Sequence, residues 1–116
     1  MTYGFDTLQV HAGARPDPAT GARQTPIYQS TAYVFRDADH AAALFNLQEV
    51  GYIYSRLTNP TVAVLQERIA TLEGGQGAVC CSSGHAAQIM ALFPLMGPGR
   101  NVVVSTRLYG GTVTQM

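Results

Sequence analysis

Three short polar stretches of this chain have residue types suited to binding an anion or a planar ligand. Residues 82–85 read Ser-Ser-Gly-His, residues 54–56 read Tyr-Ser-Arg, and Tyr109 precedes two glycines. Hydroxyl groups, free backbone amides and guanidinium groups are common donors to phosphate. An exposed aromatic ring can stack on a planar molecule. The sequence therefore indicates anion binding at the first two stretches and stacking at the third.

The 82–85 stretch lies between an apolar run and a helix-like run. Ser82 or Ser83 can cap a helix that begins near Gly84. The first amides of a helix have no intrahelical partner, and the helix dipole is positive at that end. Two interpretations stay open. The serines only cap the helix, which is the commoner role of such a short motif, or the turn also holds a small anion such as phosphate.

The other two stretches also have two interpretations each. Arg56 could bind phosphate through its two-pronged guanidinium while Tyr54 adds a hydroxyl donor. Taken alone, the pair is more simply a surface arginine beside a half-buried tyrosine. Tyr109 follows an apolar segment and could stack on a ligand, although ordinary packing explains an isolated tyrosine equally well.

Helices and strands must position these residues. The sequence predicts a helix from Asp37 to about Gln48, ended by Gly51. It predicts a second from Pro60, with Asn59 as its cap, to the stop at residues 74–75. A third is expected over residues 84–96, with Pro94 causing a kink or an early end. The apolar stripe of the second helix consists of Val62, Leu65, Ile69 and Leu72.

Two short apolar runs favour strands, and the order of elements favours an α/β fold. Residues 77–81 and 101–105 suit buried strands, and a strand, helix and strand in about 30 residues make a βαβ unit with a parallel sheet. Cys80 and Cys81 would form the buried end of the first strand. Ligands of such sheets bind beyond the carboxyl ends of the strands, where residues 82–85 and Tyr109 lie.

The first 35 residues show weak periodicity and are interrupted by glycines and prolines. They predict an extended arm that also carries Tyr28, Tyr33 and Phe35. Since a disordered tail would have few aromatics, the arm is expected to pack either on the rest of the chain or on another subunit. His11 is interpreted as a packing or hydrogen-bonding residue of the arm.

The composition of the chain argues against several classes of function. The 116 residues are 47% hydrophobic, enough for one small core, and the net charge of zero argues against a nucleic-acid partner. The adjacent cysteines lack metal or redox spacing, the histidines show no metal-like spacing, and no secretory signal is evident, which favours a cytoplasmic protein. All seven basic residues are arginines. Without lysine, these residues alone cannot complete lysine Schiff-base chemistry.

Five segments in this order resemble one enzyme family. They are "HAG...PDPATGARQTPIYQSTAYVF", "HAAALFNLQEVGYIYSRLTNPT", "LQERIATLEGG", "SSGHAAQ" and "STRLYGGT". Together they resemble the amino-terminal part of the Cys/Met-metabolism enzymes that depend on pyridoxal 5'-phosphate (PLP), and within it the O-acetylhomoserine sulfhydrylase branch. The resemblance implies fold type I, the aspartate-aminotransferase-like fold, with a mainly parallel sheet flanked by helices. Residues 1–60 would then form an arm with a short helix that packs on a neighbouring subunit, and residues 61–116 would begin a large PLP-binding domain.

The resemblance also implies roles for individual residues. Ser83, Gly84 and His85 match the turn that binds the PLP phosphate, mainly through the amides of Gly84 and His85. Tyr54 and Arg56 match the pair that reaches the PLP phosphate of the neighbouring subunit. Tyr109 matches the tyrosine that stacks on the pyridine ring and assists proton transfer, and is the one catalytic candidate.

The implied reaction is a γ-replacement in methionine and cysteine biosynthesis. O-acetyl-L-homoserine would react with sulfide or a thiol to give L-homocysteine, or a thioether, and acetate, in a cytoplasmic homotetramer built from two dimers with shared active sites. The family's Schiff-base lysine and the aspartate that pairs with the pyridinium nitrogen come later in its chain. This chain would therefore be about a quarter of an enzyme, inactive by itself. A methionine γ-lyase, a cystathionine γ-synthase, an O-succinylhomoserine sulfhydrylase and an inactive fragment remain alternatives.

Overall fold

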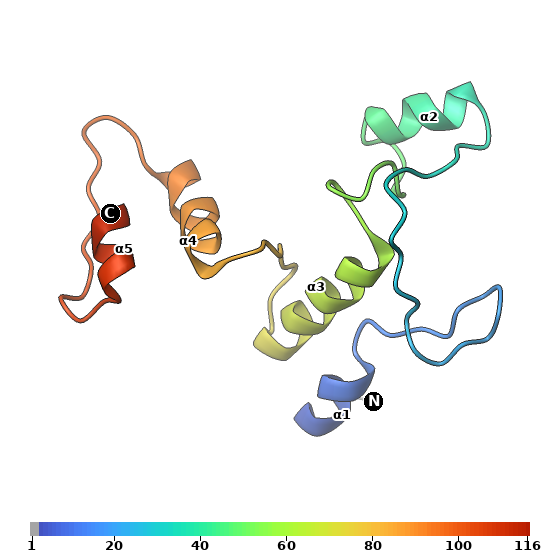
Figure 1. Ribbon diagram of the computed structural model, residues 1–116, viewed down its shortest axis with the longest axis horizontal. Helices are drawn as coiled ribbons and strands as arrows, with labels where there is room; N and C mark the ends of the chain where they lie inside the picture. Colours follow the sequence, from blue (N-terminus) through green and yellow to red (C-terminus); the bar gives the residue numbers. More distant parts are fainter. Residues whose placement is uncertain (1–2) are drawn as a thin grey trace. The chain divides into compact units, whose positions relative to one another are not determined.

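The computed structural model describes residues 3–116 and consists of short helices joined by long loops (Figure 1). In chain order the elements are α1 (Phe5–His11), α2 (Ala38–Phe45), α3 (Pro60–Glu73), α4 (Gly84–Leu92), the 3-10 helix η1 (Phe93–Leu95) and α5 (Gly110–Gln115). The chain divides into two compact units. The first ends at Val79, and the second comprises Cys80–Met116.

Helix α3 has both predicted ends. The Asn59 side chain accepts hydrogen bonds from the amides of Thr61 and Val62, and Pro60 occupies the first turn. Gly74 ends the helix with a left-handed backbone at φ 66°, a conformation that glycine adopts without steric cost. The prediction for this helix is confirmed at both boundaries.

Helix α2 begins as predicted but ends earlier. The Asp37 carboxylate accepts a hydrogen bond of 2.7 Å from the amide of His40. The helix stops at Phe45 because the chain turns at Leu47, whose φ is +57° and whose amide donates to the carbonyl of Leu44 at 3.1 Å. The predicted continuation to Gln48 and the stop at Gly51 were wrong, since leucine at positive φ is a local exception that composition does not reveal.

Helix α1 was not predicted. It packs beside α3 in the first unit (Figure 1), and Arg68 Nε donates to the carbonyl of Ala12 at 2.9 Å. At Gly13, φ is +72° and an added Cβ would lie 2.8 Å from the carbonyl oxygen of Val64. A helix of under two turns has little stability of its own, so its contacts with α3 stabilise it more than its propensity does.

Neither predicted strand forms within residues 3–116. Residues 77–81 and 101–105 have no regular secondary structure, and the one bridge pairs Ala32 with Tyr54. Val79 and Val103 are exposed. A strand exists only through hydrogen bonds to a neighbouring strand, and these segments make no such bonds to other described residues. The parallel sheet therefore stays a prediction.

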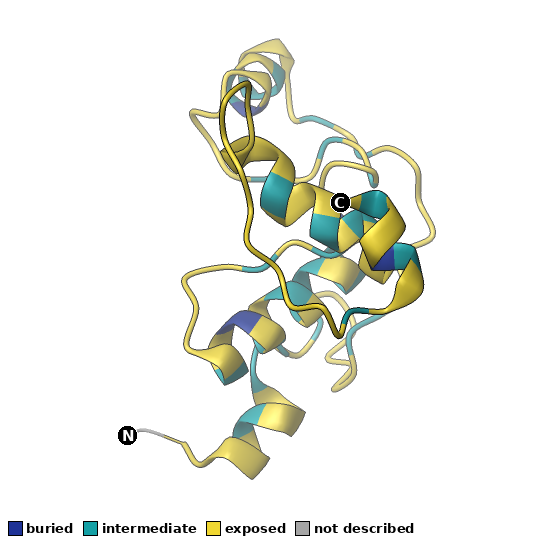
Figure 2. Ribbon diagram, turned by 90° about the vertical axis from the view of Figure 1, so that its left-hand side faces the viewer, coloured by how far each residue is buried: buried dark blue, intermediate teal, exposed yellow. Residues whose placement is uncertain are grey.

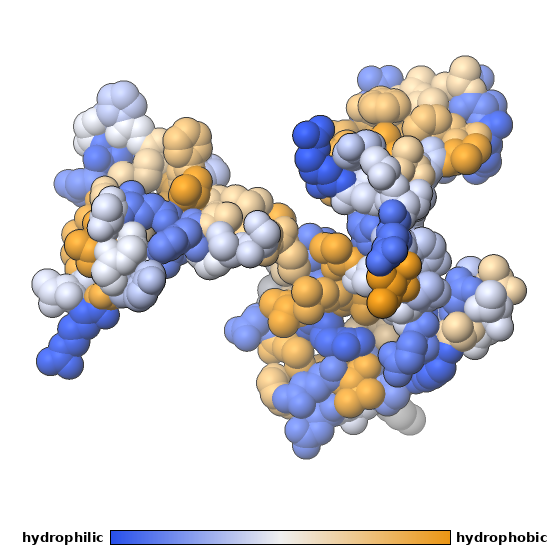
Figure 3. Space-filling view, in the orientation of Figure 1, coloured by the Kyte–Doolittle hydropathy of each residue, from blue (hydrophilic) through white to orange (hydrophobic). Residues whose placement is uncertain are grey.

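The expected small core is also missing from the described residues. Only Leu44 and Ala70 are buried apolar residues, at 2% and 8% exposure, and most of the ribbon in Figure 2 is coloured as exposed. Figure 3 shows orange apolar side chains at the surface of both units. The apolar residues are present, but the contacts among the described elements are too few to cover them.

Helix α3 belongs to the same compact unit as the arm, so the division after Val79 differs from the expected one after residue 60. Chain contacts of this kind do not test the domain organisation of a longer protein, and that division stays a prediction. No helix among residues 3–116 has both the length and the apolar character needed to cross a bilayer.

Candidate functional site

The first candidate site is the arginine loop, which we define as residues 54–56. Two backbone hydrogen bonds pair it with the arm: Ser55 N donates to Thr31 O at 2.9 Å, and Tyr33 N donates to Ile53 O at 3.3 Å. These bonds flank the antiparallel bridge between Ala32 and Tyr54. Within the described part of the chain, Ile53, Tyr54 and Ser55 thus pair locally with the arm.

A buried asparagine joins the arginine loop to α3. Asn59 is 8% exposed, and its Nδ2 lies 2.9 Å from the carbonyl oxygen of Tyr28, 3.0 Å from Ser55 Oγ and 3.3 Å from the hydroxyl of Tyr33. Its Oδ1 caps α3 at the same time. The sequence predicted the cap but not the second role, because nothing in the spacing shows where the amide nitrogen points.

The two side chains that flank Ser55 face solvent. The Arg56 guanidinium carbon lies 5.5 Å from the centroid of the Tyr54 ring, a cation–π distance. Both residues line a hollow of about 390 Å³. Within residues 3–116 the two ion pairs involve Arg36 or His40 with Glu49, and neither involves Arg56. Arg56 therefore presents an uncommitted positive charge beside a phenol.

The second candidate site is the serine turn, which we define as residues 82–85. Ser83 Oγ accepts a hydrogen bond of 3.2 Å from the amide of Ala86, so Ser83 caps α4 as predicted. Among the hydrogen bonds of the described residues, none uses the amides of Gly84 or His85 as donors. A Cβ at Gly84 would meet nothing within 4 Å. Capping and anion binding are therefore compatible, because the cap leaves these two amides free.

Tyr109 and His85 come together over a glycine. Tyr109 precedes α5, is 76% exposed, and has its ring centroid 5.8 Å from that of His85, with the planes tilted by 34°. An added Cβ at Gly111 would lie 2.7 Å from His85 Cε1 and 2.8 Å from Tyr109 Cε1. The absence of a side chain at Gly111 is what lets the two rings approach.

Three residues that the sequence analysis missed fix α4 against α5. The Gln88 amide and the Thr112 hydroxyl interact at 3.1 and 3.2 Å, and Thr112 is 4% exposed. Gln115 Nε2 donates to the carbonyl of His85 at 3.1 Å. Gln88 lies three residues after His85, on the same helix face. This spacing was the one sign in the sequence that Gln88 could help to position the site. These bonds hold the serine turn near Tyr109.

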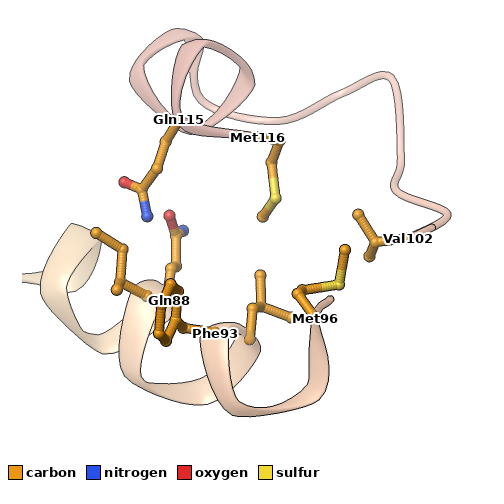
Figure 4. A pocket seen from close by; sticks show the side chains of 8 residues that line it. Gln88, Phe93, Met96, Val102, Gln115 and Met116 are labelled. Atoms are coloured by element: carbon orange, nitrogen blue, oxygen red, sulfur yellow. The ribbon is translucent and has the colours of Figure 1, made fainter. Parts of the chain in front are cut away.

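The same two helices border an apolar cavity of about 160 Å³ (Figure 4). Gln88 and Gln115 are its only polar lining residues. The others are Ile89, Leu92, Phe93, Met96, Val102 and Met116. Because the lining contains no titratable or nucleophilic group, the cavity has no evident chemistry, and none of the predicted site residues lines it.

The remaining candidate residues have structural roles. His11 Nδ1 lies 2.9 Å from an Arg23 guanidinium nitrogen, which confirms the predicted hydrogen-bonding role. Cys80 is half-buried and Cys81 is exposed, and both are free. The predicted burial is wrong for Cys81, and the strand that the two cysteines were expected to end stays a prediction. Pro94 ends α4 early, as expected, in a 3-10 turn.

Comparison with known proteins gives a consistent result. The profile of the family described as "Cys/Met metabolism PLP-dependent enzyme" matches residues 6–116. The O-acetyl-L-homoserine sulfhydrylase 1 of Thermus thermophilus is 56% identical over 111 residues, which cover 96% of this chain and 26% of that protein. The homocysteine synthase of Schizosaccharomyces pombe is 56% identical over 108 residues, 93% of this chain and 25% of that protein.

A solved structure agrees with these relatives. A protein of Campylobacter jejuni, assigned as an O-acetylhomoserine (thiol)-lyase and carrying pyridoxyl-lysine monophosphate, superposes with a TM-score of 0.90 at 47% identity. The match covers 97% of this chain and 28% of that one. The chain thus spans about a quarter of the length of the curated relatives it matches.

Proposed function

The chain belongs to the Cys/Met-metabolism PLP-dependent enzymes, and from this membership we propose that the whole protein is an O-acetyl-L-homoserine sulfhydrylase. The observation that carries the proposal is 56% identity to a relative of that name across nearly all of these residues. The proposed reaction breaks the Cγ–O bond of O-acetyl-L-homoserine, so that acetate leaves from Cγ, and sulfide or a thiol bonds to Cγ in its place to give L-homocysteine or a thioether.

The serine turn fits the phosphate group of PLP. The amides of Gly84 and His85 are exposed and have no partner among the described residues, and they lie at the positive end of α4. The open space beside Gly84 leaves room for phosphate oxygens. In this proposal the two amides and the Ser83 hydroxyl donate to the phosphate, while Ser83 Oγ still accepts from Ala86.

The arginine loop supplies a second set of donors. Arg56 presents a guanidinium that pairs with no carboxylate of residues 3–116, and Tyr54 presents a phenol beside it. Charge-assisted bonds from arginine to phosphate are among the stronger hydrogen bonds in proteins. In this proposal Tyr54 and Arg56 bind the PLP phosphate of a neighbouring subunit, in a homotetramer built as a dimer of dimers in the cytoplasm.

Tyr109 has the exposure that a stacking role needs, and the His85 ring limits its orientation. In this proposal the Tyr109 ring lies against the cofactor ring and its hydroxyl takes and returns a substrate proton. When bound, PLP supplies an electron sink for carbanions next to the substrate amino group. The described residues include no lysine, so the covalent anchor of the cofactor and the aspartate for its ring nitrogen are proposed to lie elsewhere in the whole protein.

The test uses the full-length protein supplied with PLP. O-acetyl-L-homoserine and sulfide should give homocysteine and acetate in equal amounts, and the activity should disappear when the phosphate-free analogue pyridoxal replaces PLP. Methionine alone, without sulfide, is the comparison substrate. If the protein cleaves methionine and makes no homocysteine, the proposal is wrong and a γ-lyase is the correct assignment.

A further inference from the structure

We propose that Asn59 is a positioning residue for phosphate binding, acting through the arginine loop. The idea rests on the proposed function, because it requires Tyr54 and Arg56 to bind the cofactor phosphate. It goes beyond that function by assigning a role to a buried amide that lies three residues after the end of the loop. The supporting observation is that the Asn59 side chain caps α3 and also hydrogen-bonds to Ser55.

The orientation of the Asn59 side chain is fixed from its oxygen end. Oδ1 accepts from the amide of Thr61 at 2.9 Å and from that of Val62 at 3.4 Å. These two donors belong to the first turn of α3, so they direct Nδ2 away from the helix. Nδ2 then lies 3.0 Å from Ser55 Oγ. A 180° flip would place NH2 against two amide donors and lose both capping bonds.

Ser55 is the point at which the loop is held. Its amide donates to Thr31 O at 2.9 Å, and its hydroxyl donates to the carbonyl of Ser30 while accepting from Asn59 Nδ2. The Tyr33 hydroxyl is 3.2 Å from the same oxygen. No other side chain of the loop makes a hydrogen bond with a described residue, so the directions of Tyr54 and Arg56 depend on how firmly Ser55 is fixed.

Loss of the Asn59 amide would therefore affect the phosphate donors indirectly, because the loop that carries them would be held less firmly. Ser55 Oγ would lose its buried donor, and the loop would be tied to the arm but no longer to α3. Charge-assisted bonds to phosphate are sensitive to small displacements of the donor. The expected defect is weaker binding of the phosphate group, with little change in binding of the rest of the cofactor.

The test compares Asn59→Ser with the wild type in the full-length apo-protein. Serine caps a helix about as well as asparagine and is neutral, whereas aspartate would add a charge that repels phosphate directly. Equilibrium binding is measured for PLP and for pyridoxal. We expect the Kd of PLP to rise about tenfold, the loss of roughly one buried hydrogen bond, while that of pyridoxal changes less than about twofold.

Two further variants make the result specific. Thr61→Val is the matched control, because the Thr61 hydroxyl donates to Pro26 O at 2.8 Å and accepts from Tyr28 N at 2.9 Å but does not contact the arginine loop. It should leave the ratio of the two Kd values unchanged. In a background that lacks both loop donors, Tyr54→Phe with Arg56→Ala, Asn59→Ser should have no additional effect on PLP binding.

Each outcome has a defined meaning. A phosphate-selective loss that vanishes when the Tyr54 and Arg56 donors are both removed supports the positioning role. Equal losses for PLP and pyridoxal, no loss at all, or the same selective loss in Thr61→Val overturn it, even if Arg56→Ala weakens PLP binding and the proposed function stands. If the wild type binds no PLP, the proposed function itself fails and the positioning role fails with it.

Discussion

Gly111 shows how strongly a single position can constrain the candidate site. The His85 and Tyr109 rings lie so close to it that an added Cβ would contact both at under 3 Å. Its neighbour Gly110 has nothing within 4 Å of the same added atom. The two glycines look alike in the sequence, and only the structure separates the one that packs from the one that does not.

This difference leads to the first prediction at the residue scale. Gly111→Ala should push apart the His85 and Tyr109 rings and weaken binding of both PLP and pyridoxal to the full-length apo-protein by about fivefold or more, since the ring contact is changed and the phosphate donors are not. Gly110→Ala is the control and should bind both ligands as the wild type does. Equal behaviour of the two variants would show that the ring contact at Gly111 has no role in binding.

Asn59 shows which contacts of a single residue the sequence could predict and which it could not. An asparagine before proline at a helix start predicts a cap, and its Oδ1 has that role. The partners of its Nδ2 lie 4, 26 and 31 residues away. Contacts at such separations depend on how the arm folds back, which no local pattern records.

At the scale of elements, capping residues correctly predicted where three helices begin. The structure that depends on contacts between distant parts of the chain was not predicted. Asp37, Asn59 and Ser83 all cap the helices that they were predicted to cap, because each acts on amides two or three residues ahead. Helix α1 and the pairing of the arm with residues 53–55 depend on partners far along the chain. Among the described residues, the two predicted strands make no backbone hydrogen bonds to a neighbouring strand.

Helix α4 provides a prediction that separates its cap from its proposed anion site. Ser83→Asp keeps an oxygen that can cap the helix. The free energy of unfolding of the apo-protein should therefore lie within about 1 kcal/mol of the wild-type value. The new carboxylate would lie beside the proposed phosphate position and should weaken PLP binding by about tenfold or more, through charge repulsion, with little effect on pyridoxal.

Ser83→Asn is the matched variant, because asparagine also caps helices but is uncharged. It should retain much more PLP affinity than Ser83→Asp. The measurements are thermal or denaturant unfolding of the apo-protein and equilibrium binding of the two ligands. If Ser83→Asp binds PLP as well as Ser83→Asn does, the serine turn only caps α4 and the phosphate lies elsewhere.

At the scale of the whole molecule, the described chain leaves most of its apolar side chains exposed. Only two apolar residues are buried among those described, although 47% of the sequence is hydrophobic. The folding free energy of a domain comes chiefly from apolar burial. These residues therefore lack the burial that an independently stable domain of this size needs, and the sequence could not show this because composition does not report contacts.

The corresponding prediction concerns residues 1–116 produced alone. This polypeptide should bind a hydrophobic dye such as ANS and should show a broad, weakly cooperative thermal transition, because little apolar surface is removed from water. The full-length protein under the same conditions is the control and should melt cooperatively with little dye binding. A sharp transition without dye binding for residues 1–116 would show that they fold as a stable unit.

The hydrogen bonds of Asn59 also have a consequence for the order of events during synthesis. Every one of its side-chain partners lies between Tyr28 and Val62. A ribosome adds residues from the amino terminus, and domains begin to fold as they emerge. All the groups that anchor the arginine loop are therefore present before translation reaches the serine turn. In a nascent chain, the donors proposed for the phosphate of a neighbouring subunit can therefore be positioned before the turn proposed for the chain's own phosphate has been made.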